Sequence, residues 1–233
     1  MRIKKIVKEV KKISDDFTIL DISLCYPYTY SLLEKDGKRS LGLAMLLVEE
    51  LKHIKEPIEF KDLDDLIEMS NSLNIIERTL GISTINAICQ YYIEVSEEDF
   101  KRDILEIAKQ YKNIGMIGYI KPIYEKLKEK CVVFDRKFRN DEVVSDAFEY
   151  NLIPKFDLLI ISGTTLINDT IDMILDRAKG ETILVGPTAQ LLPNMIDVDY
   201  LASVKVPEEA IKYLKLGSNY GIFRLGRKYV IKC

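Results

Sequence analysis

Hydrophobic and polar positions in the first part of the chain predict a helix followed by three strands. Apolar residues recur at helical spacing over residues 2–13, and the lysines between them form a solvated face. Three strands are predicted next, over residues 18–24, 29–33 and 39–47. Asp36-Gly37 separates the second and third strands, and this pair accepts the positive φ that a tight hairpin turn needs. We therefore expect a small antiparallel meander.

A helical period replaces the strands from residue 61 to residue 92. We expect three short helices here, with Gly81 ending the second and Ser83 capping the third. Ser96-Glu97-Glu98-Asp99 is a capping signal that opens a further helix, expected to run to residue 108. Strands followed by helices are typical of an α+β domain.

The second half alternates apolar runs with helical patterns, which is typical of parallel strands joined by crossover helices. The expected strands cover residues 113–118, 131–134, 156–161, 182–185 and 200–206. Residues 136–155 are interpreted as mostly irregular, and a terminal hairpin is expected around Gly226-Arg227. The sequence thus predicts an α/β protein: an α+β domain over residues 1–108, then a mainly parallel sheet with helices on both faces over residues 109–233.

Three of the expected parallel strands end at glycine, namely Gly118, Gly163 and Gly186. Glycine lets the backbone approach a ligand closely, and amides in the first turn of a following helix suit an anion. Hydroxyls beside two of these turns could hold the same ligand; they belong to Thr164, Thr165 and Thr188. The alternative is that these are ordinary turns with capping threonines.

Asp135 ends the strand after Gly118, where an acid that binds a ribose often lies. The glycine loop itself, Gly115-Met116-Ile117-Gly118, is not the GxGxxG dinucleotide fingerprint. Binding of a nucleotide or of S-adenosylmethionine is therefore a weaker hypothesis.

Asn168 and Asp169 follow the Gly163 turn, and Asp172 shares a helix face with Asp169. Acids at the start of a helix stabilise it, and this is the first interpretation of Asp169 and Asp172. The alternative is a site for a hard metal or a general base. His53 is the only histidine, and we expect it to be exposed. No Cys/His group has zinc spacing, so no metal ligands and no catalytic residues are assigned.

Overall composition excludes several classes of partner. A net charge of −3 gives no electrostatic reason to expect nucleic acid or an anionic membrane. No apolar run reaches the roughly 18 residues of a membrane span, and no signal peptide is visible. The four cysteines are scattered without a CxxC pair, which favours buried thiols in a cytoplasmic protein.

Two segments of the second half resemble a known family. Residues 162–170 (SGTTLINDT) and 186–193 (GPTAQLLP) are similar to the motifs T-G-T-T-L-x-N-x-T and G-P-S-T-P-x-x-P of the family labelled "putative heavy-metal chelation". The small departures are Ser162, Thr188, Ala189 and Gln190. The first half is similar to the companion domain of that family over residues 28–33, 41–44 and 80–87.

This resemblance implies an enolase-N-like domain followed by a Rossmann-like domain, with a candidate site in the cleft between them. Asn86 and Tyr28 would then reach the cleft from the first domain and face the Gly163 and Gly186 turns. Because soft metals prefer thiolate or imidazole, a metal would have to be held by carboxylates and backbone oxygens here, or arrive inside an organic ligand.

The sequence leaves three functions open. The first is binding of a small anionic metabolite or metal chelate against residues 163–165 and 186–188, including Pro187. The second is a transferase that uses S-adenosylmethionine or a nucleotide-like cofactor, with Asp135 on the ribose. The third is a non-catalytic assembly partner. The ligand's identity and the oligomeric state stay open, and a homo-oligomer is compatible with the sequence.

Overall fold

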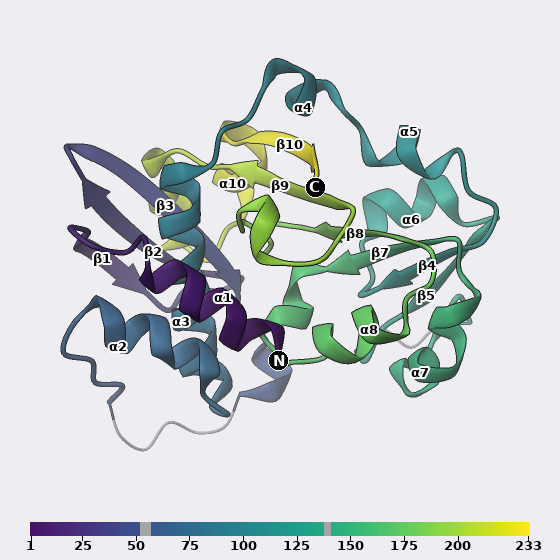
Figure 1. Ribbon diagram of the computed structural model, residues 1–233, viewed down its shortest axis with the longest axis horizontal. Coiled ribbons are helices and arrows are strands. Elements are labelled where there is room, and N and C mark those ends of the chain that lie inside the picture. Colours follow the sequence, from purple (N-terminus) through teal and green to yellow (C-terminus); the bar gives the residue numbers. More distant parts are fainter. Residues whose placement is uncertain (52–56, 138–140) are drawn as a thin grey trace.

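Two β-sheets and the helices around them make up the fold (Figure 1). The structure is a computed structural model that describes residues 1–51, 57–137 and 141–233. The predicted exposed position of His53 lies outside these residues. The first sheet has the order β1-β2-β3 and is antiparallel, with strands β1 (Thr18–Ser23), β2 (Tyr28–Lys35) and β3 (Lys38–Met45). Asp36 and Gly37 both have positive φ between β2 and β3, so the predicted hairpin turn is confirmed.

Helix α3 (Ile75–Tyr92) lies against this sheet and contacts both β2 and β3. Helices α1 (Arg2–Lys11) and α2 (Leu63–Glu68) pack on it from the other side, with a 3₁₀ turn, η2 (Met69–Asn71), after α2. Fourteen of the 18 residues of α3 are buried, so water reaches little of its surface. Such a helix has no polar face, which is why its sequence lacks a clear amphipathic period.

The prediction of two helices meeting between Gly81 and Ser83 is wrong, because α3 is continuous through both residues. Gly81 is needed for space: a Cβ there would lie 2.2 Å from the amide nitrogen of Ser70 in η2. The Ser83 hydroxyl does not cap a helix and instead lies 2.8 Å from the hydroxyl of Ser31 on β2. The true N-cap is Asn74, whose side chain accepts from the amide of Ile76. Gly81 and Ser83 therefore serve close packing inside one continuous helix, although in the sequence they resemble the end of one helix and the start of the next.

Gly42 brings β3 equally close to this helix. A Cβ at Gly42 would lie 2.0 Å from the amide nitrogen of Ala87 and 2.1 Å from the carbonyl oxygen of Ser83. Only glycine can bring a strand and a helix this near.

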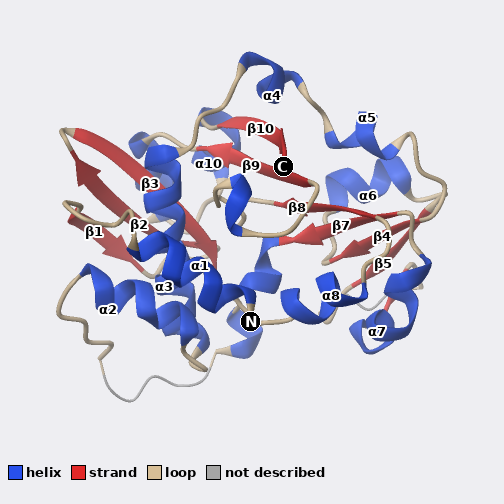
Figure 2. Cartoon of the chain, in the orientation of Figure 1, coloured by secondary structure: helices blue, strands red, loops and turns tan. Residues whose placement is uncertain are grey.

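The second sheet has seven strands in the order β10-β9-β8-β7-β4-β5-β6 (Figure 2). Their bounds are β4 (Ile114–Ile117), β5 (Cys131–Phe134), β6 (Val143–Val144), β7 (Leu158–Ser162), β8 (Glu181–Val185), β9 (Tyr200–Lys205) and β10 (Arg227–Lys232). All neighbouring pairs are parallel except β9 and β10. The mixed α/β class and the mainly parallel sheet predicted from the sequence are therefore confirmed.

Three local predictions are wrong, two in this half and one in the first. Residues 220–225 form helix α10 (Tyr220–Leu225) instead of a hairpin arm, and β10 pairs with β9. The stretch predicted to be irregular contains β6, helix α7 (Glu149–Leu152) and short 3₁₀ turns on either side of α7. The helix predicted to run to residue 108 is two helices, α4 (Glu97–Lys101) and α5 (Ile104–Ala108), and the predicted capping box opens the first.

Apolar side chains cover both faces of the parallel sheet. One face packs Met116, Ile160 and Ile183 with α5 and α6 (Lys121–Leu127). The other packs Leu159, Ile161 and Leu184 with α8 (Ile171–Arg177), α1 and α3. The second cluster also contains Leu33 and Ala44 of the small sheet, so one apolar core crosses from one sheet to the other.

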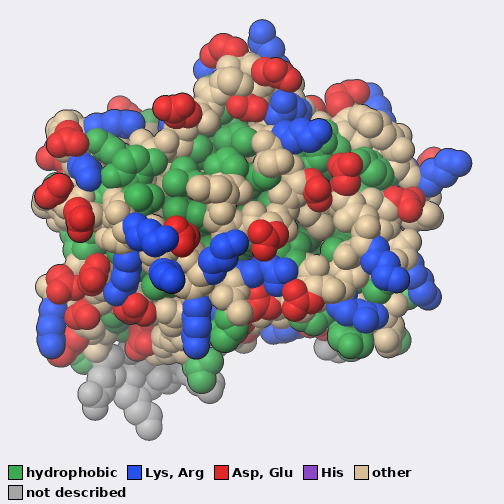
Figure 3. Space-filling model, viewed as in Figure 1, with side chains coloured by type: hydrophobic (Ala, Val, Ile, Leu, Met, Phe, Trp, Pro, Cys, Tyr) green, Lys and Arg blue, Asp and Glu red, His purple; other side chains and the backbone are tan. Residues whose placement is uncertain are grey.

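The surface carries charges of both signs. Figure 3 shows Lys and Arg side chains interspersed with Asp and Glu on the face it draws, in keeping with the net charge of −3. Within the described residues, no helix is both long enough and apolar enough to cross a membrane.

Candidate functional site

The carboxyl ends of the central parallel strands form one edge of the large sheet. Strand β4 is followed by β5 and β6 on one side, whereas β7 and β8 lie on its other side, so the strand order reverses between β4 and β7. The register places Ile117 at the end of β4 beside Ile161 of β7 and beside Phe134 of β5. Ligands of open parallel sheets usually bind outside the carboxyl ends at such a reversal.

The glycine turn after β4 touches the turn after β7. Gly118 has a φ of 85°, and a Cβ there would lie 2.8 Å from the Cβ of Ser162. Gly163 in turn packs on the loop after β8, since a Cβ on it would lie 2.8 Å from the amide nitrogen of Ala189. The structure thus brings together the three glycine turns that the sequence singles out.

Several polar groups in these turns bond within the turns or to the sheet. The amide of Gly118 donates to the carbonyl of Phe134, and the amide of Gly186 donates to that of Ala202. The buried Thr165 hydroxyl donates to the Ser162 carbonyl at 2.8 Å. Ser162 and Thr164 pair through their hydroxyls at 2.9 Å, and both side chains are partly exposed. These two hydroxyls are therefore the groups of the Gly163 turn most open to an outside partner.

A second group of predicted residues joins the two sheets. The buried Asn86 amide donates to the carbonyls of Leu43 on β3 and of Thr188, at 2.7 and 2.9 Å. The hydroxyl of Thr188 accepts from the amide of Met45 at 3.0 Å. Gln190, which the sequence treats only as a departure from a motif, accepts from the Leu43 amide at 2.8 Å and donates to the Val204 carbonyl at 2.9 Å. Asn86, Thr188 and Gln190 thereby occupy the free edge of β3.

Pro187 is buried in the same loop, beside Gly186, whose φ is 115°. Tyr28, proposed from the resemblance, begins β2. Its ring packs with Tyr30, Val204 and Ile222 in the apolar cluster beneath the small sheet, and burial raises the pKa of its hydroxyl to about 12. The Tyr28 backbone pairs with Met45, whose amide donates to the Thr188 hydroxyl.

Asp135 connects the turns after β4 and β5. Its carboxylate accepts from the amide of Tyr119 and from the amide of Lys137, both at 2.7 Å. The predicted position beside the Gly118 turn is therefore the observed one, and the carboxylate holds the two turns in place.

The polar residues after the Gly163 turn make local bonds and ion pairs. Asn168 accepts from the amide and the hydroxyl of Thr170. Asp169 pairs with the guanidinium of Arg78, a buried side chain of α3. The carboxylate of Asp172 accepts from the backbone amide of Arg2 at 2.9 Å and pairs with the Arg2 guanidinium at 3.3 Å. Asp169 therefore ties α3 to the loop before α8, whereas Asp172, in the first turn of α8, ties that helix to α1.

Glu149 is a buried carboxyl near the same edge that the sequence analysis missed. It begins α7, which follows β6, and only 6% of its surface is exposed. Burial, reinforced by the negative charges of Asp146 and Asp135, raises the pKa of Glu149 to about 7, although Arg136 opposes this. Carboxyls with such a pKa can exchange a proton near neutral pH, which is common at functional sites. No local pattern marks Glu149, because its burial arises only when the chain folds.

Side chains that could hold a soft metal do not gather in this structure. Within residues 1–51, 57–137 and 141–233, no three His, Cys, Asp or Glu side chains are grouped so as to hold a metal ion. Cys25, Cys89 and Cys131 are buried free thiols. Cys89 lies 3.6 Å from the sulfur of Met195, but burial raises the pKa of its thiol to about 12, so the thiolate that a metal needs is disfavoured.

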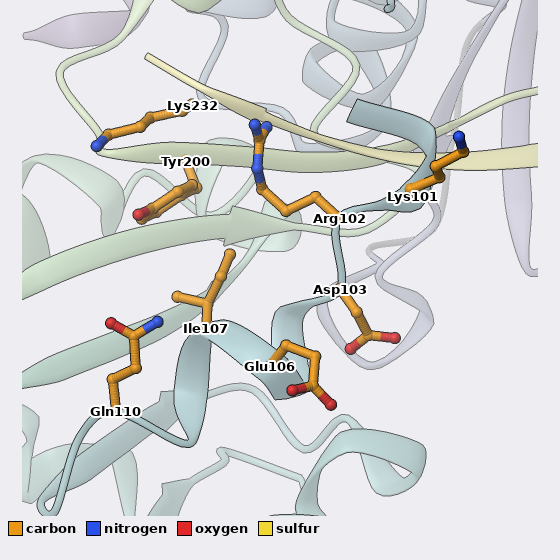
Figure 4. Close-up of a pocket in the computed structure, with 8 residues that line it drawn as sticks. All are labelled: Lys101, Arg102, Asp103, Glu106, Ile107, Gln110, Tyr200 and Lys232. Atoms are coloured by element: carbon orange, nitrogen blue, oxygen red, sulfur yellow. The ribbon is translucent and has the colours of Figure 1, made fainter. Parts of the chain in front are cut away.

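A large open cavity of about 420 Å³ lies elsewhere on the molecule (Figure 4). Its lining comes from the α4–α5 region together with Tyr200, which begins β9, and Lys232, which ends β10. These residues lie at the opposite end of β9 from its carboxyl end. No residue proposed from the sequence lines this cavity.

Comparison with known proteins places the fold in a family. Two family models, both described as "Putative heavy-metal chelation", match residues 7–89 and 103–233. An uncharacterized protein of Methanocaldococcus jannaschii is 40% identical over 237 aligned residues, which cover 94% of this chain and 91% of that protein.

Two solved structures, both described as having unknown function, share the architecture. One, from Pyrococcus horikoshii, is 39% identical, covers 100% of both chains and has a TM-score of 0.93. The other, from Desulfitobacterium hafniense, is 16% identical, covers 99% of this chain and 98% of its own, and has a TM-score of 0.78, a likeness of fold alone. On these matches, the chain belongs to the family described as "Putative heavy-metal chelation".

Proposed function

We propose that this protein binds a small organic ligand at the carboxyl edge of its parallel sheet, where the turns after β4 and β7 touch. The observation that carries this proposal is the contact of Gly118 with Ser162 at the point where the strand order reverses. The finer description of the fold, a Rossmann-like sheet behind an enolase-N-like first half, is part of the same proposal.

The chemistry of the edge favours a ligand that carries hydroxyl or amino groups. Ser162 and Thr164 supply partly exposed hydroxyls, and the carboxylate of Asp135 lies at the end of the neighbouring strand. The amides of Gly118 and Gly186, which an anion would need, already donate to sheet carbonyls. Donor groups on the ligand therefore match this edge better than a bare anion does.

The family description directs attention to metals. Because the described side chains offer no metal-binding group, a metal would reach this protein inside an organic chelate, with the organic part contacting Ser162 and Thr164. Anionic metabolites and metal chelates both remain ligand classes to be tested.

The test combines ligand discovery with two variants. Native mass spectrometry of the freshly purified protein, followed by titration with metals, chelates, S-adenosylmethionine, nucleotides and pterins, identifies the ligand. Ser162→Ala and Thr164→Val are each expected to weaken its affinity about three- to tenfold, because each removes one hydrogen bond. Thr18→Val, a change of an exposed threonine on β1, is the matched control and is expected to leave affinity unchanged.

Affinity that stays the same in both variants and the control would place the ligand elsewhere. Failure of every ligand class to bind would favour the third hypothesis, a non-catalytic assembly partner.

A nucleotide-like cofactor is the second candidate, and the position of Asp135 favours it. Its carboxylate lies beside the Gly118 turn, at the end of the adjacent strand. Asp135→Asn keeps an oxygen for the Tyr119 amide but removes the charge that would bind ribose hydroxyls. Because the Lys137 amide loses its acceptor in this variant, a lower melting temperature is expected. Loss of affinity for S-adenosylmethionine or a nucleotide in the variant that is still folded would support this candidate, and unchanged affinity would exclude it.

A further inference from the structure

A smaller cavity of about 110 Å³ lies between the two halves of the molecule, at the carboxyl end of β9. Its walls come from β3 and the end of α3 on one side, and from the end of β9 and the following residues Val206 to Glu208 on the other. Water occupies about 30 Å³ per molecule in the liquid, so the space suits a group the size of a few waters.

Two buried polar atoms in this wall have no hydrogen-bond partner among the described residues. One is the hydroxyl oxygen of Ser40 on β3, and the other is Oε1 of Gln90 on α3. Ser40 is 7% exposed and Gln90 is 4% exposed. The other end of the Gln90 amide is fixed, since Nε2 donates to the hydroxyl of Tyr229 at 3.0 Å. Buried polar groups are almost always satisfied, so an occupant of the cavity that bonds both atoms would remove an unfavourable feature.

Positive charge dominates the same wall. Lys38, Arg39 and Lys205 line the cavity, against the single acid Glu208, which pairs with Arg39 at 2.9 Å. Burial and the nearby charge of Lys38 lower the pKa of Lys205, whose amine reaches only the Ile93 carbonyl at 3.2 Å. An anion in the cavity would stabilise the charged form of Lys205.

The free edge of β3 adds a backbone donor. Leu43 directs both its amide and its carbonyl outward, to Gln190 and to Asn86. Peptide groups two residues apart on an edge strand face the same way, so those of Leu41 face outward too, and Leu41 lines the cavity.

We propose that this cavity is a phosphate site, which binds inorganic phosphate or the phosphate group of a small monoester. The charges call for an oxyanion, whereas Gln90 Oε1 only accepts and so requires an O–H on the ligand. Inorganic phosphate near neutral pH carries both a negative charge and an O–H, and a phosphate monoester does so below its second pKa of about 6. Sulfate has the same shape but no proton to donate, so it matches the lysines and leaves Gln90 unsatisfied.

Isothermal titration at about pH 5.5, where methyl phosphate keeps its O–H, with inorganic phosphate, methyl phosphate and sodium sulfate tests this specificity. Phosphate or methyl phosphate is expected to bind at least about tenfold more tightly than sulfate, because only they satisfy Gln90. Tighter binding of methyl phosphate identifies a monoester as the ligand, and tighter binding of inorganic phosphate identifies the free ion. Equal affinity for phosphate and sulfate, or no binding of either phosphate compound, would overturn the proposal.

A matched pair of serine variants separates binding from stability. Ser40 and Ser203 are equally buried, but the Ser203 hydroxyl donates to the Gly186 carbonyl at 2.8 Å, whereas Ser40 has no described partner. Ser40→Ala is expected to weaken phosphate binding about three- to tenfold without lowering the melting temperature of the ligand-free protein. Ser203→Ala is expected to do the reverse, lowering the melting temperature and leaving phosphate affinity unchanged.

Gln90→Glu provides a second variant that keeps the side-chain shape. A carboxylate facing the anion is expected to abolish phosphate binding, while its oxygen can still accept from the Tyr229 hydroxyl. If Ser40→Ala and Gln90→Glu both bind phosphate as the unaltered protein does, the cavity is not the phosphate site.

Discussion

Glu149 couples the charge of one residue to the stability of the whole protein. Its pKa is about 7 in the folded protein, mainly because the carboxyl is buried, and lies in the ordinary range for glutamate once the chain unfolds. Between these two values the folded state binds more protons than the unfolded state. The contribution of Glu149 to stability therefore falls as pH rises from about 4.5 to about 7.

Replacement by glutamine removes this loss. Glu149→Gln is expected to raise the free energy of unfolding, relative to the unaltered protein, by about 1–3 kcal/mol more at pH 8 than at pH 5. Urea denaturation at the two pH values measures this difference. Glu129→Gln, at an exposed glutamate, is the control and is expected to change stability by less than about 0.5 kcal/mol at either pH. An equal effect of Glu149→Gln at both pH values would show that the carboxyl titrates normally.

Residues of the candidate site were predictable where their role follows from the neighbouring sequence alone. Gly118, Gly163 and Gly186 end strands, and the parallel arrangement of those strands brings their turns together. Glu149 was missed because its burial is a property of the folded chain, in which α7 packs against α8. Gln190 was missed because its role depends on the free edge of β3, which is distant in the sequence. Tyr28 was proposed from the resemblance, and its side chain belongs to the apolar cluster that also holds Val204 at the end of β9.

At the scale of elements, the free edge of β3 shows how two sheets are joined without a shared ladder. The amides of Leu43 and Met45 would be unpaired at this edge, and the side chains of Gln190 and Thr188 bind them. Edge strands left open invite pairing with other chains, so this arrangement also protects the edge.

Gln190→Met tests this junction with little change in side-chain volume. It leaves the buried amide of Leu43 and the carbonyl of Val204 without partners and is expected to cost about 2–4 kcal/mol of unfolding free energy. Hydrogen exchange of the Leu43 amide is expected to accelerate. Gln110→Met, at an exposed glutamine, should change stability by less than about 0.5 kcal/mol. Unaltered exchange at Leu43 in Gln190→Met would show that water replaces the side chain without loss.

Elements were predicted well where the pattern is unambiguous: α1 has one apolar face at helical spacing, and the central parallel strands are continuous apolar runs buried on both faces. Prediction failed for α3, whose surroundings are protein on almost every side, so that Gly81 and Ser83 resemble helix ends while they serve close packing. It failed for α10 because a short helix with exposed Phe223 and Leu225 has the apolar content of a strand.

At the scale of the molecule, the apolar core is continuous between the sheets. Ile6 of α1 and Ala44 of β3 belong to the same cluster as Ile161 of β7 and Ile174 of α8. The predicted boundary at residue 108 stays a prediction, but the core gives a reason to expect the two halves to unfold together.

Urea unfolding followed by NMR at Ala44 and at Ile160 is expected to give coincident transitions. Ile6→Ala, which empties a fully buried position, is expected to cost about 2–5 kcal/mol and to shift both transitions equally. A shift at Ala44 alone, or two separate midpoints in the unaltered protein, would show that the halves are independently stable.

The near-complete cover of α3 has a consequence for how the protein is made. Gln90, near the end of this helix, bonds to Tyr229 on β10, and Ile93 just after it packs with Tyr229 and Ile231. During translation, the largely apolar α3 leaves the ribosome long before β10 has been synthesised. Until β10 is available, the apolar surface of α3 must therefore be covered by the small sheet alone or by a chaperone.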